Sequence, residues 1–457
     1  MDALKSWLFL AAGMVLLTAG LAGCGPGTER AAPAMTMEEA CSPVRSKEDP
    51  ALARVRRALR KPIDVAFDKT PLTQALKVIS EKAGVAIIPA PDFAASGIDL
   101  SLRVMSLAVT GVPADELLDL ILSADLAYVV EGDRVLVTTR SAAQQKMPCV
   151  LYPVADLVHS GDPDSEVGRQ ELMDIIKRNV INLADRNVAA WTDEGGPAAI
   201  DYYDGVFVVT QTLRGQERVM DLLTMLRKAK SQEGSCEPVR MPETAGAKHI
   251  RRRLAERVDV DFENAPLLGV LDFLREALKD VNLVVAPDLA TQGIDLTLRD
   301  ATLKWKQAPI GEILARVLGT DLAYRVYPHY VLVSTRDKLY QDLPMVMYPI
   351  RDIVKATAGD SPLGKPFGGG VGEDVLAVGW PEVGIGRQGV ADIIKRTVSS
   401  MTDPNVEAWA DEGGPAAMDY YDGVLVVKQT PEGHERIAEF FALLREGLAR
   451  VERQLQE

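Results

Sequence analysis

The sequence predicts an α+β protein made of small mixed α/β modules, arranged as a tandem duplication of an A–B pair. One observation is a stretch written twice, because Trp191–Thr212 and Trp409–Thr430 are identical at 18 of 22 positions. Another is the segment at about 62–140, whose pattern returns 195 or 196 residues later. Short apolar runs alternate with short amphipathic runs in each copy, which favours several small sheets with helices over one large sheet.

Composition limits the classes of function. The chain has 457 residues, 47% hydrophobic and 25% charged, which suits globular modules with real cores. The net charge is −14. Nucleic-acid binding needs a concentrated basic surface, so we expect no nucleic-acid partner.

The N-terminus has the pattern of an export signal. A largely apolar run, Leu8–Leu21, follows Lys5 and ends in Leu21-Ala22-Gly23-Cys24. These four residues resemble the lipobox of bacterial lipoproteins. The resemblance implies a signal peptide at 1–23, an acylated Cys24 and a lipid anchor in the bacterial cell envelope. Gly25 after the cysteine suits the periplasmic face of the outer membrane. The alternative is an uncleaved anchor with an incidental cysteine.

Residues 24–61 are predicted to form a tether and a short basic helix. The stretch up to about residue 45 has little periodicity, which is typical of a disordered linker. Ala51–Arg60 is basic and is expected to be a solvated helical lead-in, with weak affinity for anionic lipid as the alternative.

Module A1, 62–141, is predicted to contain strands at 63–67, 85–88 and 98–102 and helices at 72–82 and 114–124. Gly84 is expected to cap the first helix. A hairpin at 126–130 and 134–138 turns at Glu131-Gly132-Asp133. Module A2, 257–338, repeats this order after a linker at 233–256.

Module B1, 148–232, has the predicted order βαββα. Its hairpin turns at Asp204-Gly205, a type I′ signal. Module B2, 345–457, repeats the order and carries a Gly-rich insert at about 357–389, which is expected to be a mobile loop.

Both module types resemble envelope proteins. The A pattern, with its first strand, its Pro-led helices and Gly97-Ile98-Asp99-Leu100, resembles the N-terminal domains of secretins and the short N-terminal (STN) domain of TonB-dependent receptors. The B order resembles the ring-forming, KH-like periplasmic modules of secretins. The resemblance implies envelope-protein partners at a secretin-type or TonB-type machine. A secretin would continue past Glu457 into a membrane-inserting domain, so we expect no pore made by this chain alone.

No constellation of catalytic or metal-ligating residues stands out. Gly384–Gly389 fits G-x-G-x-x-G but lacks the preceding buried strand of a dinucleotide site. Nucleophile motifs and zinc-type His/Cys spacings are absent from the sequence. We therefore expect no enzyme activity, no metal and no cofactor.

The repeated stretch supplies the interaction candidates, because loop residues held unchanged between copies suggest contact with a partner. The alternative is a structural role, with the aromatic residues in the core. The candidates are Trp191, Asp193, Glu194, Tyr203, Trp409, Asp411, Glu412 and Tyr421. Cys149 and Cys236 flank module B1 and are a candidate disulfide in an exported chain.

The function predicted from these features is a non-enzymatic envelope lipoprotein that acts as a periplasmic scaffold or protein–protein interaction module. Two alternatives remain. One is an enzyme or small-ligand binder that uses an inter-module cleft with the 357–389 loop as a lid. The other is a self-assembling ring component without its own pore, which makes the chain its own partner.

Overall fold

A computed structural model describes the fold over defined parts of the chain. The described residues are 42–45, 49–93, 97–122, 125–158, 166–180, 188–232, 237–340, 343–357, 387–398, 407–412 and 414–456. They all belong to one compact unit, Ser42–Glu457. The predicted signal peptide, Cys24, Cys41, Cys236, residues 358–386 of the insert and the first half of the Gly384–Gly389 motif lie outside the described residues. Within the described part, no helix is both long and apolar enough to cross a membrane.

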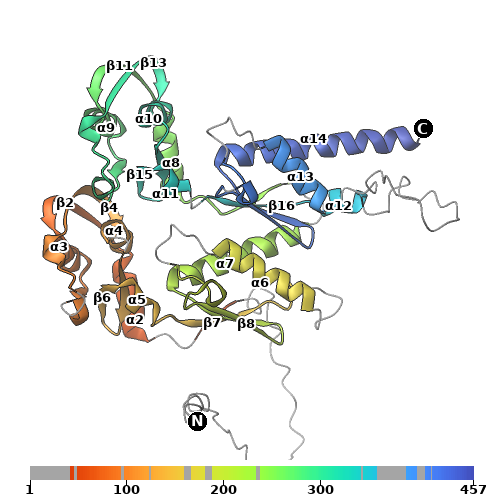
Figure 1. The fold of residues 1–457 in the computed structure, drawn as a ribbon, viewed down its shortest axis with the longest axis horizontal. Helices are drawn as coiled ribbons and strands as arrows, with labels where there is room; N and C mark the ends of the chain where they lie inside the picture. Colours follow the sequence, from red (N-terminus) through yellow and green to blue (C-terminus); the bar gives the residue numbers. More distant parts are fainter. Residues whose placement is uncertain are drawn as a thin grey trace, which may run out of the picture. The chain divides into compact units, whose positions relative to one another are not determined.

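Each A module has a two-stranded and a three-stranded sheet (Figure 1). The elements of A1 are β2 (Pro62–Pro71), α3 (Leu72–Ala83), β3 (Ala86–Pro89), β4 (Val104–Pro113), α4 (Ala114–Ile121), β5 (Leu126–Glu131), β6 (Arg134–Thr139) and α5 (Arg140–Gln144). Those of A2 are β11 (Arg257–Pro266), α9 (Leu267–Leu278), β12 (Asn282–Val285), β13 (Asp300–Pro309), α10 (Ile310–Leu318), β14 (Leu322–Val326), β15 (Tyr330–Thr335) and α11 (Arg336–Tyr340).

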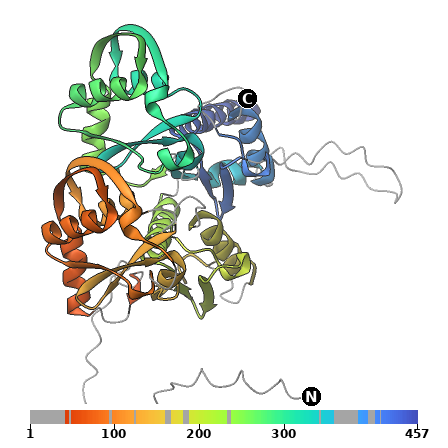
Figure 2. The same cartoon turned by 60° about the vertical axis from the view of Figure 1, so that its left-hand side comes forward.

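The sheets of the A modules combine local and long-range pairing. Strands β2 and β4 pair antiparallel, as do β11 and β13, and α3 and α9 pack against these pairs (Figure 2). In the second sheet β3 pairs parallel with β6, which also forms the predicted hairpin with β5. The small mixed sheets with flanking helices confirm the predicted α+β class.

One predicted strand of module A1 is wrong. Residues 98–102 alternate apolar and polar, but Leu100–Leu102 is a 3₁₀ turn. The Asp99 carboxylate accepts a hydrogen bond from the Ser101 backbone N–H at 2.8 Å, which favours the turn over a strand. The strand that follows, β4, was not predicted, and the same turn and strand recur in A2 at Leu296–Leu298 and β13.

Each B module is a four-stranded antiparallel sheet with helices on one face. The elements of B1 are β7 (Cys149–Pro153), α6 (Glu166–Val180), β8 (Ala199–Tyr203), β9 (Val206–Thr210) and α7 (Leu213–Ser231). Those of B2 are β16 (Met345–Pro349), α12 (Arg351–Thr357), α13 (Arg387–Val398), β17 (Ala417–Tyr421), β18 (Val424–Lys428) and α14 (Pro431–Gln456). This order confirms the βαββα prediction. Asp204 and Gly205 both have positive φ, at 44° and 80°, as a type I′ turn requires.

Two segments predicted to be connections belong to the fold. Strand β1 (Val44–Arg45), inside the predicted tether, adds to the B1 sheet in the order β1-β7-β9-β8. Strand β10 (Val239–Arg240), inside the predicted linker, adds to the B2 sheet in the order β10-β16-β18-β17. Each B sheet is therefore completed by a strand that precedes the A module in the chain.

The helices of these two segments also pack into the core. Helix α2 (Pro50–Leu59) buries Val55 and Leu59, and α8 (Ala245–Leu254) buries the matching Ile250 and Leu254. The prediction of a solvated lead-in helix is wrong, because α2 lies against β5, β6 and α4. Arg54 and Arg57 mark the exposed side of a packed amphipathic helix.

One buried polar position is occupied by a different residue in each B module. In B1, Gln216 Nε2 donates to the Pro148 carbonyl at 3.0 Å, and the Tyr152 hydroxyl donates to Gln216 Oε1 at 2.9 Å. In B2 the matching residue is His434, whose Nε2 lies 2.9 Å from the Pro344 carbonyl and whose Nδ1 lies 3.0 Å from the Tyr348 hydroxyl. A carbonyl only accepts, so Nε2 carries the proton and Nδ1 accepts from the tyrosine.

We predict that His434→Gln makes the protein less sensitive to acid. Burial lowers the pKa of His434 from 6.5 to about 4. Between these two pH values, His434 is protonated in the unfolded chain and neutral in the folded protein. The folded state should therefore lose about 3 kcal/mol as the pH falls from 7 to 4, at about 1.4 kcal/mol per pKa unit. Urea unfolding of the wild type and the variant across this range measures the difference, and parallel pH profiles would contradict it.

Candidate functional site

The two faces of each B sheet differ in what covers them. In B1 the inward face carries Val150, Tyr152, Phe207 and Val209, all of which are buried. The outward face carries the alternate residues of the same strands, because side chains point to opposite sides along a strand. Cross-strand pairing places Val44, Leu151, Val208 and Asp201 in one row of this outward face, with Val206 and Tyr203 in the next.

In module B2 the outward face of the sheet is covered by module B1. Helix α7 packs against β10, β16 and β18, and α6 packs against β17 (Figure 1). The B2 residues that join the hydrophobic core of B1 are Val239, Met347, Tyr421, Val424 and Val426. We call α6 and α7 the B1 helix layer. One side of this layer packs on the B1 sheet, and its outer side packs on the B2 sheet.

Tyr421 lies at the centre of this contact. Its side chain is 0% exposed, and its hydroxyl donates to the Leu157 carbonyl of B1 at 2.7 Å. Burial raises the pKa of the Tyr421 phenol, which keeps it a neutral donor. A buried hydroxyl is costly unless it is hydrogen-bonded, so this bond fixes where the ring can sit.

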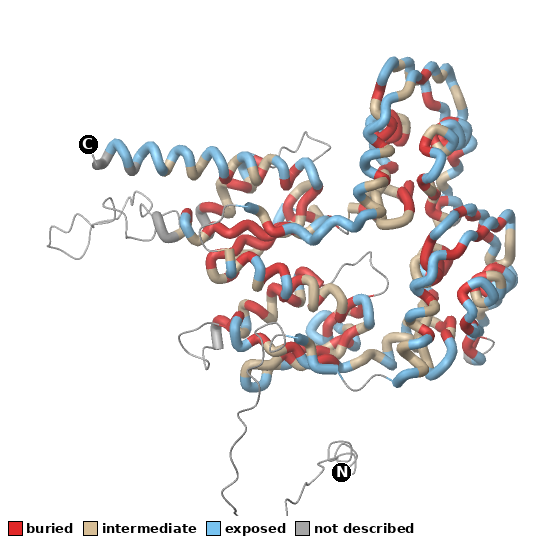
Figure 3. Tube along the Cα trace, turned by 180° about the vertical axis from the view of Figure 1, so that it is seen from behind, coloured by how far each residue is buried: buried red, intermediate tan, exposed pale blue. Residues whose placement is uncertain are grey.

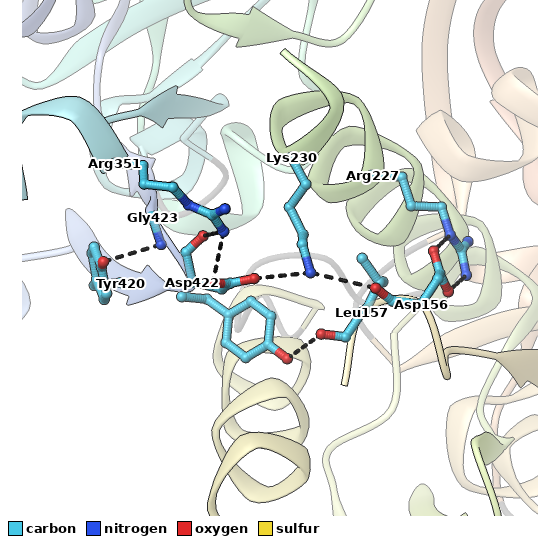
Figure 4. A network of polar contacts seen from close by, with 9 residues as sticks. Asp156, Leu157, Arg227, Lys230, Arg351, Tyr420, Asp422 and Gly423 are labelled. Carbon is cyan, nitrogen blue, oxygen red and sulfur yellow. Dashed lines mark hydrogen bonds and ion pairs between the residues drawn. The ribbon is translucent and has the colours of Figure 1, made fainter. Parts of the chain in front are cut away.

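Charged groups surround the tyrosine. Asp422 at the B2 hairpin turn pairs with Lys230 of B1 at 2.9 Å and with Arg351 of its own module at 2.8 Å (Figure 4). Lys230 Nζ also lies 3.4 Å from the Asp156 carbonyl oxygen, and Arg227 holds the Asp156 carboxylate at 2.7 Å. The network therefore links the turn of one module to the loop and last helix of the other.

A second polar group lies at the other end of the B2 hairpin. Asp419 pairs with Arg178 at 2.7 Å and accepts a hydrogen bond from the Asn179 amide at 3.0 Å. Lys428 Nζ donates to the Arg178 carbonyl at 3.3 Å. Partly exposed ion pairs contribute little free energy, so these contacts set the register while apolar burial supplies most of the stability.

Among the described residues, nothing covers the same face of module B1. Val44, Leu151 and Tyr203 are 56%, 37% and 77% exposed, whereas the matching Val239, Met347 and Tyr421 are 2%, 0% and 0% exposed. We call this B1 surface the open face and define it by Val44, Leu151, Asp201, Tyr203, Val206 and Val208. Its sequence nearly matches that of the B2 face that module B1 covers.

The predicted interaction residues separate into three groups. Trp191 and Trp409 are core residues, at 0% and 1% exposed, which was the structural alternative. Asp193 and Asp411 pair with lysines of the preceding helix, Lys177 at 2.9 Å and Lys395 at 2.7 Å. Glu194 and Glu412 are exposed, and a partner for them stays a prediction. Tyr421 lies in the contact between the B modules, and Tyr203 lies on the open face.

The unchanged Trp–Gly loop has a structural explanation. Trp191 Nε1 donates to the Lys177 carbonyl at 3.1 Å, and its own carbonyl accepts from Gly196 N at 2.8 Å. Gly195 has φ 81°, and a Cβ on Gly196 would lie 2.0 Å from the Ala190 carbonyl oxygen. Two glycines are therefore needed to close the loop over the buried indole.

The candidate disulfide stays a prediction. Cys149 is exposed with a free thiol, and Cys236 lies outside the described residues. Cys149 sits at the edge of the open face, opposite Thr210 of β9.

A cavity of about 1330 Å³ lies where A1, B1 and A2 meet. Its lining includes Glu116, His329 and Arg214. Glu116 contacts His329 Nδ1 at 2.9 Å across the two A modules, and burial raises the pKa of Glu116 while His329 opposes the rise. No group of three His, Cys, Asp or Glu residues within the described part is placed to hold a metal ion.

Sequence reasoning missed the features that make the two copies unequal. Strands β1 and β10 share the dipeptide Val-Arg, 195 residues apart, which could have indicated that the repeat starts before module A. Arg351 and Lys230, which hold Asp422, have Ala155 and Leu448 at the matching positions. These differences between near-identical copies could have indicated that Arg351 and Lys230 fix the B2 hairpin turn and that the B1 turn lacks the same two ion pairs.

We predict that Tyr421→Ala destabilises the protein and that Tyr203→Ala does not. Loss of a fully buried ring costs about 3 kcal/mol, and loss of an exposed one changes the free energy of unfolding by about 0.5 kcal/mol or less. Urea unfolding followed by the fluorescence of the buried Trp191 and Trp409 measures both variants. Equal destabilisation by the two substitutions would contradict the assigned contact.

Comparisons with known proteins give distant similarities. No family model matches the chain. No curated protein matches it. Among solved structures, the GspC-GspD complex of the type II secretion system of enterotoxigenic Escherichia coli is 17% identical, with 36% of this chain and 96% of that chain covered and a TM-score of 0.14.

The N-terminal domain of the secretin XcpQ from Pseudomonas aeruginosa is 11% identical. The match covers 47% of this chain and 78% of that chain, with a TM-score of 0.13. TM-scores and identities this low do not bear on the function of this chain, so its assignment depends on its own contacts.

Proposed function

We propose that the protein is a non-enzymatic scaffold of the bacterial cell envelope that binds another protein through the open face of module B1. The observation that carries the proposal is the contrast between two equal surfaces. Tyr421 is buried by a helix layer, while Tyr203, in the same local sequence, is 77% exposed. Because the matching B2 face packs against a helix layer, the open face of B1 is suited to bind a similar surface.

The chemistry of the open face fits protein binding. Val44, Leu151, Val206 and Val208 form an apolar strip across three strands, and exposed apolar patches of this kind mark interaction sites. Tyr203 adds a rigid ring with a polar end, a residue type that carries much of the binding free energy at interfaces. Asp201 at the end of the strip supplies a charge that can fix orientation.

The envelope location rests on the sequence. Leu21-Ala22-Gly23-Cys24 resembles a lipobox, and acylation of Cys24 would hold the modules at a membrane, on the periplasmic side of the outer membrane in our proposal. The resemblance of the modules to secretin and STN domains supports an envelope-protein partner, at a secretin-type or TonB-type machine.

A second candidate function is small-ligand binding in the cavity between A1, B1 and A2. Its volume of about 1330 Å³ and its charged lining favour a polar ligand. The polar groups that line this cavity include Glu116 and His329, which already contact each other. Substitutions on the open face would leave this binding unchanged, which separates the two candidates.

Photo-crosslinking in intact cells tests the proposed function. A photoreactive phenylalanine analogue replaces Tyr203 in the full chain, and we expect a crosslinked protein product because the open face is occupied in the envelope. In a Cys24→Ser variant the chain should leave the membrane fraction and the product should decrease.

The control places the same analogue at Lys82, which is exposed at the end of α3 in module A1. An absence of any Tyr203 product above the Lys82 level would contradict the proposal. Unchanged membrane association of Cys24→Ser would contradict the anchor.

A further inference from the structure

We infer that the open face of one copy of this chain receives the helix layer of module B2 from a second copy. The inference rests on the proposed function, that the open face binds protein, and names the partner. The contact would repeat, between chains, the contact that B1 and B2 make within one chain. Among the described residues, the B1 sheet face and the outer side of the B2 helices are left without a covering segment.

The sheet half of the contact is retained almost completely in module B1. Five of the six positions of the open face have the same residue in the covered B2 face, and the sixth changes from Leu151 to Met347. The identical pairs are Val44/Val239, Asp201/Asp419, Tyr203/Tyr421, Val206/Val424 and Val208/Val426. A surface this similar should accept the same kind of helix layer.

The helix half is present in module B2, and no other described segment packs on its outer side. In B1, three apolar residues of α6 and α7, the helices that pack on the B2 strands, are almost fully buried: Ile175, Leu222 and Met225 are 1%, 1% and 3% exposed. Their counterparts are also apolar: Ile393 and Phe440 are half-buried, and Leu443 is 61% exposed. Figure 3 shows that much of α14 is exposed. These three helix positions are thus buried in B1 and less buried in B2, and we assign them to the contact.

The polar contacts are partly retained. Arg178 and Asp419, which pair at 2.7 Å inside the chain, have the exposed counterparts Arg396 and Asp201. The acceptor of the Tyr421 hydroxyl is the Leu157 carbonyl, which lies in a turn, whereas the matching Ile353 lies inside helix α12. This hydrogen bond is therefore not repeated in the same form. Lys230 has become Leu448, so the ion pair to the hairpin turn is not repeated.

The contact would be head-to-tail, because a sheet face meets a helix layer and not a second sheet face. Such a heterologous contact leaves each new copy with one free surface of each kind, and it builds a ring or an open filament according to the rotation between copies.

The A modules do not add to the contact. Inside the chain, Asn282 and His329 of A2 contact Thr110 and Glu116 of A1, but their counterparts in A1 are Ala86 and Asp133. We therefore expect the contact between chains to be weaker than the one within a chain and to depend on concentration.

Cysteine crosslinking of mixed variants tests the inference. Full chains with Cys41, Cys149 and Cys236 changed to Ser carry either Asp201→Cys or Arg396→Cys and are purified in mild detergent. With a short bifunctional thiol reagent, a mixture of the two variants should give at least about tenfold more crosslinked dimer than either variant alone, since a tenfold ratio needs a difference of only 1.4 kcal/mol.

Two controls set the scale. A chain with both Arg178→Cys and Asp419→Cys should crosslink within itself, which shows that the reagent spans this contact. Adding Tyr203→Glu to the Asp201→Cys chain should abolish the dimer, because a charge would enter an apolar contact. Its urea midpoint should not change, since Tyr203 is exposed in the single chain.

Each outcome decides the matter. Dimer from Asp201→Cys alone, or a mixture no better than the single variants, overturns the head-to-tail contact. If the photoreactive group at Tyr203 then captures a different envelope protein, the proposed function stands and the inference fails. If it captures nothing, both fail. A Tyr203 product with the mass of two chains, together with the mixed-variant dimer, supports both.

Discussion

The burial of Tyr421 by the B1 helix layer is the interaction on which the arrangement of the two B modules depends. A small sheet with helices on one side leaves its other face bare, and an apolar face in water is unfavourable. The B2 sheet solves this by lying on α6 and α7 of B1, with the Leu157 carbonyl accepting from the tyrosine hydroxyl at 2.7 Å. The B1 sheet has nearly the same residues on that face, and no helix among the described residues covers them.

Small substitutions make the two copies unequal after duplication. Arg351 and Lys230 hold the Asp422 carboxylate at the B2 turn, whereas Ala155 has no side chain that could hold Asp204 in the same way. In the core, one hydrogen bond is kept although the residue differs. Gln216 in B1 and His434 in B2 each donate to the carbonyl of the matching proline. The sheet face is thus nearly the same in the two B modules, while the ion pairs at its hairpin turn differ. This difference suits one contact within the chain and one contact with a partner.

Much of the fold could be predicted from local sequence. Asp204-Gly205 specifies its turn through backbone conformation alone, and the helices follow from apolar periodicity. Residues 98–102 misled the prediction, because alternation alone does not distinguish a strand from a turn held by Asp99. The two-residue strands β1 and β10 could not be predicted, since they pair with residues about 100 positions away and carry no period of their own.

The candidate site was harder to predict than the fold, because Tyr203 and Tyr421 have nearly identical neighbours in sequence and differ in what packs on them. Burial of the repeated tryptophans was within reach of sequence reasoning, whereas the covered and open faces required the tertiary contacts. The lipobox and the Gly-rich insert stay predictions from sequence.

Hydroxyl-radical footprinting of the two tyrosines tests the central claim most directly. In a dilute solution of the full chain, Tyr203 should be oxidised much faster than Tyr421, because one ring is open to water and the other is covered by module B1. Raising the protein concentration should protect Tyr203 and leave Tyr421 unchanged. Equal oxidation of the two tyrosines in dilute solution would contradict the account.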